Sequence, residues 1–297
     1  MAMKISLQHI SKQYKGKYAL KDFTTELQEG VYGLLGANGA GKTTLINIFV
    51  GILASDNGTV LIDDQDATVL GKDFLSQIGY MPQYPVFYRD FKVMDFLLYM
   101  CALKGIPAEL GEKRALKLLK TVNLLDAKDK KIGTLSGGMR QRVGIVQAML
   151  GDPKILILDE PTAGLDPSER IRFRNLISQF AQGRTVLLAT HIVSDVECIA
   201  KEIIILKEGT LITQGTTDVL EQSIYGKVWE VTVNFDTATQ LGNQYYVSNM
   251  KQQGDCYQMR IVSDVPPMAN AVKALPNLED VFLYYFGERK NDTLNQI

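Results

Sequence analysis

Cysteine and histidine are scarce in this sequence. The 297 residues include three cysteines and two histidines. Cys101, Cys198 and Cys256 lie far apart and form no CxxC pair, and His9 and His191 are equally isolated. Disulfide frameworks and zinc sites need closely spaced ligands. The sequence therefore disfavours both kinds of site and favours a reducing compartment.

Long hydrophobic runs and a surplus of basic residues are also missing. The most apolar stretch, residues 43–55, has 13 residues and contains Asn47, whereas a membrane-spanning helix needs about 20 apolar residues. The N-terminal segment MAMKISLQHI lacks the apolar core of a signal peptide. The net charge is −1, with six Lys/Arg and eight Asp/Glu after residue 226. We expect no membrane span and no nucleic-acid partner.

Strand and helix patterns alternate along most of the chain. Continuous apolar runs indicate buried parallel strands at 31–36, 154–160 and 184–191. Alternating patterns predict half-buried strands at 5–14, 23–30 and 59–66. Apolar residues three and four apart predict helices at 42–53, 91–105, 108–125, 136–150 and 167–181. This alternation predicts an α/β fold.

The pattern of apolar and polar residues changes after about Tyr225. Short patterns predict strands at 227–235, 244–250 and 256–263, a helix at 268–276, a helix or strand at 278–287, and a frayed polar tail at 288–297. We therefore predict two domains, residues 1–222 and a small α+β domain of residues 223–297.

The segment GANGAGKT fits the phosphate-loop pattern G-x-x-x-x-G-K-[ST] through Gly36, Gly41, Lys42 and Thr43. Glycines let the backbone N–H groups wrap a phosphate, and the helix that follows directs its positive end at the same anion. Lys42 would bind the β and γ oxygens, and the Thr43 hydroxyl would ligate Mg²⁺. Placement between a strand and a helix favours a nucleotide site over a chance glycine-rich turn.

Polar residues follow two of the predicted buried strands. Asp159 and Glu160 end the strand ILILDE, at the sheet edge where ligands bind in parallel sheets. Asp159 would hold Mg²⁺, and Glu160 would orient or deprotonate the attacking water. His191 ends the next strand, where it is either structural or a γ-phosphate contact. Gln83 follows YMP and is either an exposed loop residue or a ligand of metal or water.

The segment LSGGMRQR repeats part of this chemistry without a lysine. Ser136, Gly137 and Gly138 open a predicted helix, whose free N–H groups form a second anion-binding turn. The plain alternative is an ordinary N-cap serine followed by two flexible glycines.

Together, the phosphate loop, Gln83, LSGG, ILILDEP, AGLD and His191 resemble, in that order, the ATP-binding cassette of ABC transporters. The resemblance covers about residues 4–222. It implies a phosphate-loop cassette with a mixed or parallel core sheet, an antiparallel β subdomain and a helical subdomain at about 84–150. In that family, two cassettes form a head-to-tail dimer with two ATP molecules at the interface. Ser136 and the two glycines would then complete the ATP site of the opposite subunit.

The resemblance also implies roles for individual residues. Tyr14 would stack on adenine, with Tyr18 as a competitor, and 164–166 would link the two sites. Residues expected to bind the nucleotide are Tyr14, Gly36, Asn38, Gly39, Ala40, Gly41, Lys42, Thr43, Thr44, Ser136, Gly137 and Gly138. Residues expected to hold Mg²⁺ are Thr43, Gln83 and Asp159, and those expected to act in catalysis are Glu160, His191 and Gln83. Met139 stands where the family commonly has Gln, which puts any polar contact of that side chain in doubt.

By the same resemblance, the chain is an ATPase subunit that drives separate transmembrane permease subunits from the cytoplasmic face of the membrane. The aromatic segment 84–105 would receive the permease, although its side chains could equally pack the subdomain's own core. The ending NLEDVFLYYF resembles bacterial drug and antimicrobial-peptide exporters. The partner cassette could be a second copy or a different chain. The alternatives are a soluble ABC ATPase acting on ribosomes or DNA and an unrelated phosphate-loop kinase.

Overall fold

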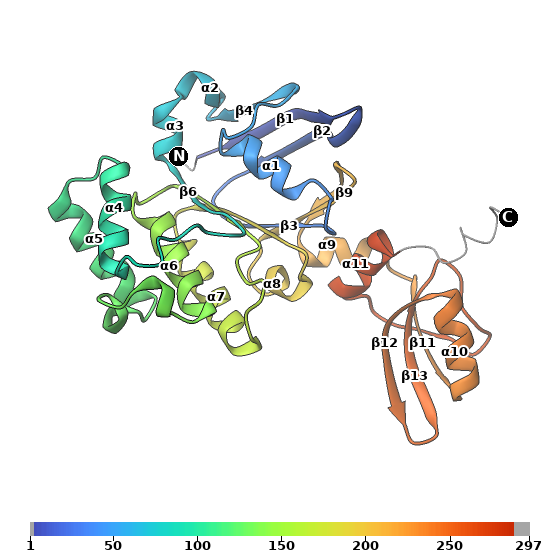
Figure 1. Cartoon of the computed structure of the whole chain (residues 1–297). Helices are drawn as coiled ribbons and strands as arrows, with labels where there is room; N and C mark the ends of the chain where they lie inside the picture. Colours follow the sequence, from blue (N-terminus) through green and yellow to red (C-terminus); the bar gives the residue numbers. More distant parts are fainter. Residues whose placement is uncertain (1–2, 288–297) are drawn as a thin grey trace. The chain divides into compact units, whose positions relative to one another are not determined.

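The computed structural model describes residues 3–287 and confirms the α/β fold (Figure 1). The chain divides into two compact units, residues 1–212 and 213–297. Among the described residues, no helix is long and apolar enough to span a membrane. The polar tail predicted at 288–297 lies outside the part that the structure describes.

The first unit is built on a six-stranded sheet in the order β10-β9-β3-β8-β7-β6. These strands are β3 (Gly30–Leu35), β6 (Ile78–Met81), β7 (Ile155–Asp159), β8 (Thr185–Thr190), β9 (Glu202–Lys207) and β10 (Thr210–Gly215). All residues of β7 and β8 are buried, as expected for strands covered on both faces. β3, β8 and β7 run parallel, with Leu35 beside Thr190 and Asp159 beside Ala189. Their carboxyl ends therefore meet at one edge of the sheet.

An antiparallel sheet in the order β2-β1-β4-β5 shares its core with this parallel sheet. The elements here are β1 (Ile5–Tyr14), β2 (Lys17–Leu27), α1 (Lys42–Phe49), β4 (Asn57–Ile62), β5 (Gln65–Asp66), α2 (Ala67–Leu70) and α3 (Lys72–Ser76). One continuous apolar cluster joins both sheets to α1, including Phe23, Phe49 and Leu187. This shared core holds α1, and the loop that precedes it, in a fixed position.

Helices separate β6 from β7 and follow β7 and β8. They are α4 (Val93–Leu103), α5 (Ala108–Thr121), α6 (Gly137–Met149), α7 (Pro167–Phe180) and α8 (Val193–Glu197), with 3-10 turns at Leu125–Ala127 and Ile132–Thr134. The aromatic segment before α4 divides into two parts. The ring of Phe87 lies edge-on to buried Phe96, with centroids 5.4 Å apart. Tyr88, Phe91 and Tyr99 instead form a cluster that is more than one-third exposed.

The second unit contains a four-stranded sheet in the order β12-β13-β11-β14. Its elements are α9 (Thr217–Ser223), β11 (Val228–Val233), α10 (Phe235–Gln244), β12 (Tyr246–Gln253), β13 (Cys256–Val262), β14 (Val272–Lys273) and α11 (Leu278–Phe286). A small core gathers the apolar residues of β11 and β13 with Ala238 and Leu241 of α10. These two helical residues are three positions apart, so they share one face of α10.

One sequence-based expectation for this unit was wrong, and one helix was missed. The helix predicted at 268–276 is absent, and Val272 and Lys273 form β14 against Glu230 and Trp229. Backbone pairing with an edge strand is available there, whereas so short an isolated helix is marginal in water. Helix α10 was not predicted, although its N-cap is clear, because Asn234 Oδ1 accepts a hydrogen bond from the Thr237 N–H at 2.9 Å.

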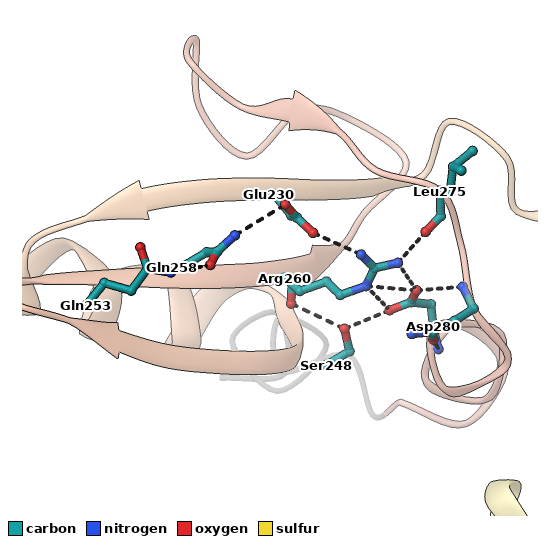
Figure 2. A network of polar contacts seen from close by, with 8 residues as sticks. Glu230, Ser248, Gln253, Gln258, Arg260, Leu275 and Asp280 are labelled. Atoms are coloured by element: carbon teal, nitrogen blue, oxygen red, sulfur yellow. Dashed lines mark hydrogen bonds and ion pairs between the residues drawn. The ribbon is translucent and has the colours of Figure 1, made fainter.

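An ionic network fixes α11 to this sheet (Figure 2). Arg260 of β13 lies between two carboxylates, with 2.7 Å to Asp280 of α11 and 3.0 Å to Glu230 of β11. Ser248 of β12 donates a further hydrogen bond of 2.7 Å to Asp280. The Asp280 side chain is fully buried, so its charge requires these partners. The predicted helix or strand at 278–287 is therefore a helix, held to its sheet by a satisfied charge.

Candidate nucleotide-binding site

The loop between β3 and α1 has a shape that requires glycine. Gly41 has a φ of 107°, and a Cβ there would lie 2.4 Å from the Ala19 carbonyl oxygen. A Cβ on Gly36 would lie 2.6 Å from the Leu206 carbonyl oxygen. Because both contacts are to backbone, neither neighbour can move aside cheaply. These glycines leave a concave backbone at the start of α1, which suits an anion.

Lys42 is buried at the base of this loop. Its Nζ donates hydrogen bonds to the carbonyl oxygens of Gly36 at 2.7 Å and Ala37 at 3.3 Å. The same nitrogen lies 3.3 Å from Glu160 Oε1. A buried ammonium group paired with one carboxylate is positioned to bind a more strongly charged anion that enters the loop.

Asp159 meets the other side of the loop through Thr43. The Thr43 hydroxyl donates a hydrogen bond of 3.1 Å to Asp159 Oδ2. Burial raises the pKa of the Asp159 carboxyl above its usual value, and the nearby charge of Glu160 raises it further, while the Thr43 hydrogen bond opposes both. Asp159 Oδ1 is buried without a hydrogen-bond partner. A hydroxyl beside an unsatisfied carboxylate oxygen suits Mg²⁺, which commonly binds one or two carboxylates together with phosphate.

Glu160 contacts His191 at the same sheet edge. Glu160 Oε2 lies 2.9 Å from His191 Nδ1, and the Glu160 N–H donates to the Ala189 carbonyl oxygen at 2.9 Å. Glu160 is buried, whereas 44% of the His191 side chain is exposed. The backbone of Glu160 has a φ of 47°, which is strained for a residue with a Cβ. Such strain persists only where the surrounding structure holds it, and it is common at functional sites.

A pocket forms over these residues. Its lining consists of Ala19, Asn38, Gly39, Ala40, Gly41, Lys42, Thr43, Thr44, Gln83 and Glu160. Gln83 thus comes together with the loop, although it lies between β6 and α4. Ala19 was missed, because only the folded register shows that β2 passes beside Gly41. Tyr14 and Tyr18 are outside this lining and about half exposed.

The LSGG segment lies elsewhere on the same unit. Ser136 caps α6, and its hydroxyl accepts a hydrogen bond of 3.2 Å from the Met139 N–H. Ser136 and Gly137 are exposed, and nothing lies within 4 Å of a Cβ placed on Gly137. Gly138 is buried, and a Cβ there would lie 2.7 Å from Glu169 Oε2. None of these three residues lines the pocket of its own chain.

Comparison with known proteins places this geometry in a family. The family model described as "ABC transporter" matches residues 20–163. The Nod factor export ATP-binding protein I of Burkholderia orbicola is 31% identical over 303 residues, covering 97% of this chain and 98% of that protein. This chain belongs to the ABC transporter ATP-binding proteins. Like other ABC cassettes, it is an ATPase that binds nucleotide, and the pocket over the phosphate loop is the candidate site for that nucleotide.

Solved ABC cassettes share the fold. The structure of cbiO1 from Clostridium perfringens, part of the ABC transporter complex cbiONQ, has a TM-score of 0.67 and 30% identity. It covers 74% of this chain and 91% of its own. A dimeric post-hydrolysis ABC cassette bound to ADP and phosphate has a TM-score of 0.64 and 28% identity, covering 71% and 98%. The expected cassette with its mixed sheets and helical part is therefore confirmed.

Proposed function

We propose that the chain hydrolyses ATP at the interface of a head-to-tail dimer and thereby drives the permease of a membrane exporter. The observation that carries this proposal is the separation of two anion-binding turns in one unit. The pocket around Lys42 contains neither Ser136 nor Gly137, which lie exposed and available to a second cassette. The dimeric form of a similar cassette supports the same arrangement.

The polar residues in and around the pocket have proposed tasks in the reaction. Lys42 leaves Glu160 and binds the β and γ oxygens of ATP, while the N–H groups of 38–44 hold the phosphates. Glu160 Oε2 takes the proton of the attacking water, and His191 orients that carboxylate and contacts the γ-phosphate. Thr43, Asp159 and Gln83 would hold Mg²⁺, which when bound neutralises charge on the phosphates. Ser136 from the second cassette would donate to the γ-phosphate.

The exporter assignment and the permease partner rest on further observations. The Burkholderia relative is named for Nod factor export, and cbiO1 is named as part of a transporter complex. The cluster of Tyr88, Phe91 and Tyr99 exposes aromatic rings on the helical part. We propose that this cluster binds the cytoplasmic surface of the permease, which would place the chain at the cytoplasmic face of the membrane. The second unit, in this proposal, is an accessory domain.

A Glu160→Gln variant tests the central step. Gln keeps the size and a hydrogen-bond acceptor but cannot take a proton. Turnover should fall by about 100-fold or more, in the range of lost general-base catalysis, and the ATP-bound dimer should accumulate in size-exclusion chromatography. A parental hydrolysis rate in this variant would overturn the assignment of Glu160.

A further inference from the structure

A buried polar contact lies just beyond the pair formed by Glu160 and His191. Thr162 is 1% exposed, Asp195 is fully buried, and the Thr162 hydroxyl donates a hydrogen bond to Asp195 Oδ2. Thr162 lies two residues after Glu160, and Asp195 lies four residues after His191. The two segments that follow β7 and β8 are therefore joined by two side-chain contacts, one between Glu160 and His191 and one between Thr162 and Asp195.

Further hydrogen bonds support both segments that form the Thr162–Asp195 contact. On one side, the Leu165 N–H donates to the Thr162 carbonyl oxygen at 3.2 Å, so Thr162 also closes the turn that follows Glu160. On the other side, Arg174 of α7 donates to the Ser194 carbonyl oxygen at 2.6 Å, which fixes the start of α8. Arg170 and Arg174 bring positive charge near Asp195. Both segments that carry the buried pair therefore make further hydrogen bonds.

Glu160 needs such a support. Its φ of 47° is strained, and its partner His191 is nearly half exposed. Two backbone hydrogen bonds hold Glu160 itself, from its N–H to the Ala189 carbonyl oxygen at 2.9 Å and from the Ala163 N–H to its own carbonyl oxygen at 3.2 Å. The Thr162–Asp195 contact, closed to water, restrains the backbone two residues after the carboxylate.

We propose that Thr162 and Asp195 are positioning residues that hold the Glu160 carboxylate in line with the attacked phosphoryl group. Neither residue lines the pocket, so they act through Glu160 and His191. This inference rests on the proposed function, because it takes Glu160 as the group that receives the proton. An error of about 1 Å in such a group costs about 100-fold in rate. Binding of ATP, which depends on Lys42 and the loop, should be unaffected.

The experiment compares two variants with a matched control. Thr162→Val removes the donor with little change in size and should lower kcat by about 10- to 100-fold, with KM for ATP changed by less than about threefold. Thr162→Ser restores the hydroxyl and should recover most of kcat. The control is Thr185→Val, because Thr185 is also buried and its hydroxyl donates to the Gln28 carbonyl oxygen at 2.9 Å, away from the pocket. Its kcat and KM should match those of the parent.

A further variant, Asp195→Asn, tests the same contact in case Thr162→Val does not fold. Asp195→Asn keeps an oxygen that can accept from Thr162 and should lower kcat with unchanged KM to a smaller extent. A parental kcat in both Thr162→Val and Asp195→Asn overturns the inference, as does an equal loss in Thr185→Val. If Glu160→Gln retains parental turnover, the proposed function fails by itself. If Glu160→Gln is inactive while Thr162→Val keeps the parental kcat, only the positioning role fails.

Discussion

The two anion-binding turns of the cassette start from similar sequences and differ in their surroundings. Both have glycines at the start of a helix and a hydroxyl residue beside them. The turn at 36–44 packs against β2 through Gly41, contains buried Lys42, and contacts two buried carboxylates, those of Asp159 and Glu160. In the turn at 135–138, Ser136 and Gly137 are exposed, there is no lysine, and the serine makes an ordinary N-cap hydrogen bond.

This difference matters for the proposed reaction. In it, a γ-phosphate in the pocket would meet donors of one chain from the loop, from Lys42 and from His191. Phosphoryl transfer needs donors around all of the equatorial oxygens, because negative charge is spread over them in the transition state. In the proposed dimer, Ser136 and Gly137 of the second chain would supply further N–H groups and a hydroxyl.

Lys42→Ala should produce the largest effect, because it removes the ammonium charge from the turn at 36–44. We expect ATP hydrolysis to fall at least about 1,000-fold, together with weaker nucleotide binding. The measurement is steady-state ATPase activity alongside titration with a fluorescent nucleotide. Lys113→Ala serves as the control, because Lys113 is exposed and pairs only with Glu109 on the same helix. Comparable losses in both variants would mean that Lys42 has no special role.

Ser136→Ala should produce a smaller and more selective effect. We expect kcat to fall by about 10- to 100-fold while dilute single chains bind ATP with unchanged affinity. Losing an N-cap also costs about 1 kcal/mol of stability. Asn234→Ala removes the N-cap of α10 in the other unit and is therefore the matched control for that cost. The account is contradicted if Asn234→Ala loses as much kcat as Ser136→Ala.

Phe91→Ala should have the smallest effect on the isolated cassette. Phe91 lies in the exposed aromatic cluster and does not line the pocket. Basal ATP hydrolysis should stay within about twofold of the parent, as for other surface substitutions. In the complex with its permease, stimulation of hydrolysis by substrate should be lost. Preserved stimulation would assign the cluster to packing within the helical part alone.

Sequence reasoning succeeded where a local pattern determines the structure. The apolar runs before Asp159 and His191 predict adjacent parallel strands, and such strands bring their carboxyl ends to one edge. Contacts that depend on how strands and loops pack in the folded chain could not be predicted from the sequence. The approach of Ala19 to Gly41 is one example, and the Thr162–Asp195 hydrogen bond is another. The helical pattern at 268–276 was overridden by pairing with an edge strand, which tertiary structure alone provides.

Complementation between two impaired chains tests most directly whether two protomers share each ATP. A Lys42→Ala chain is mixed with a Ser136→Ala chain, and ATPase activity is measured against total concentration. Each mixed pair would contain one intact site, so activity should return to about a quarter of the parental value if pairing is random. Parental activity should also rise more than linearly with concentration. No recovery in the mixture, with a constant specific activity of the parent on dilution, would contradict the shared site.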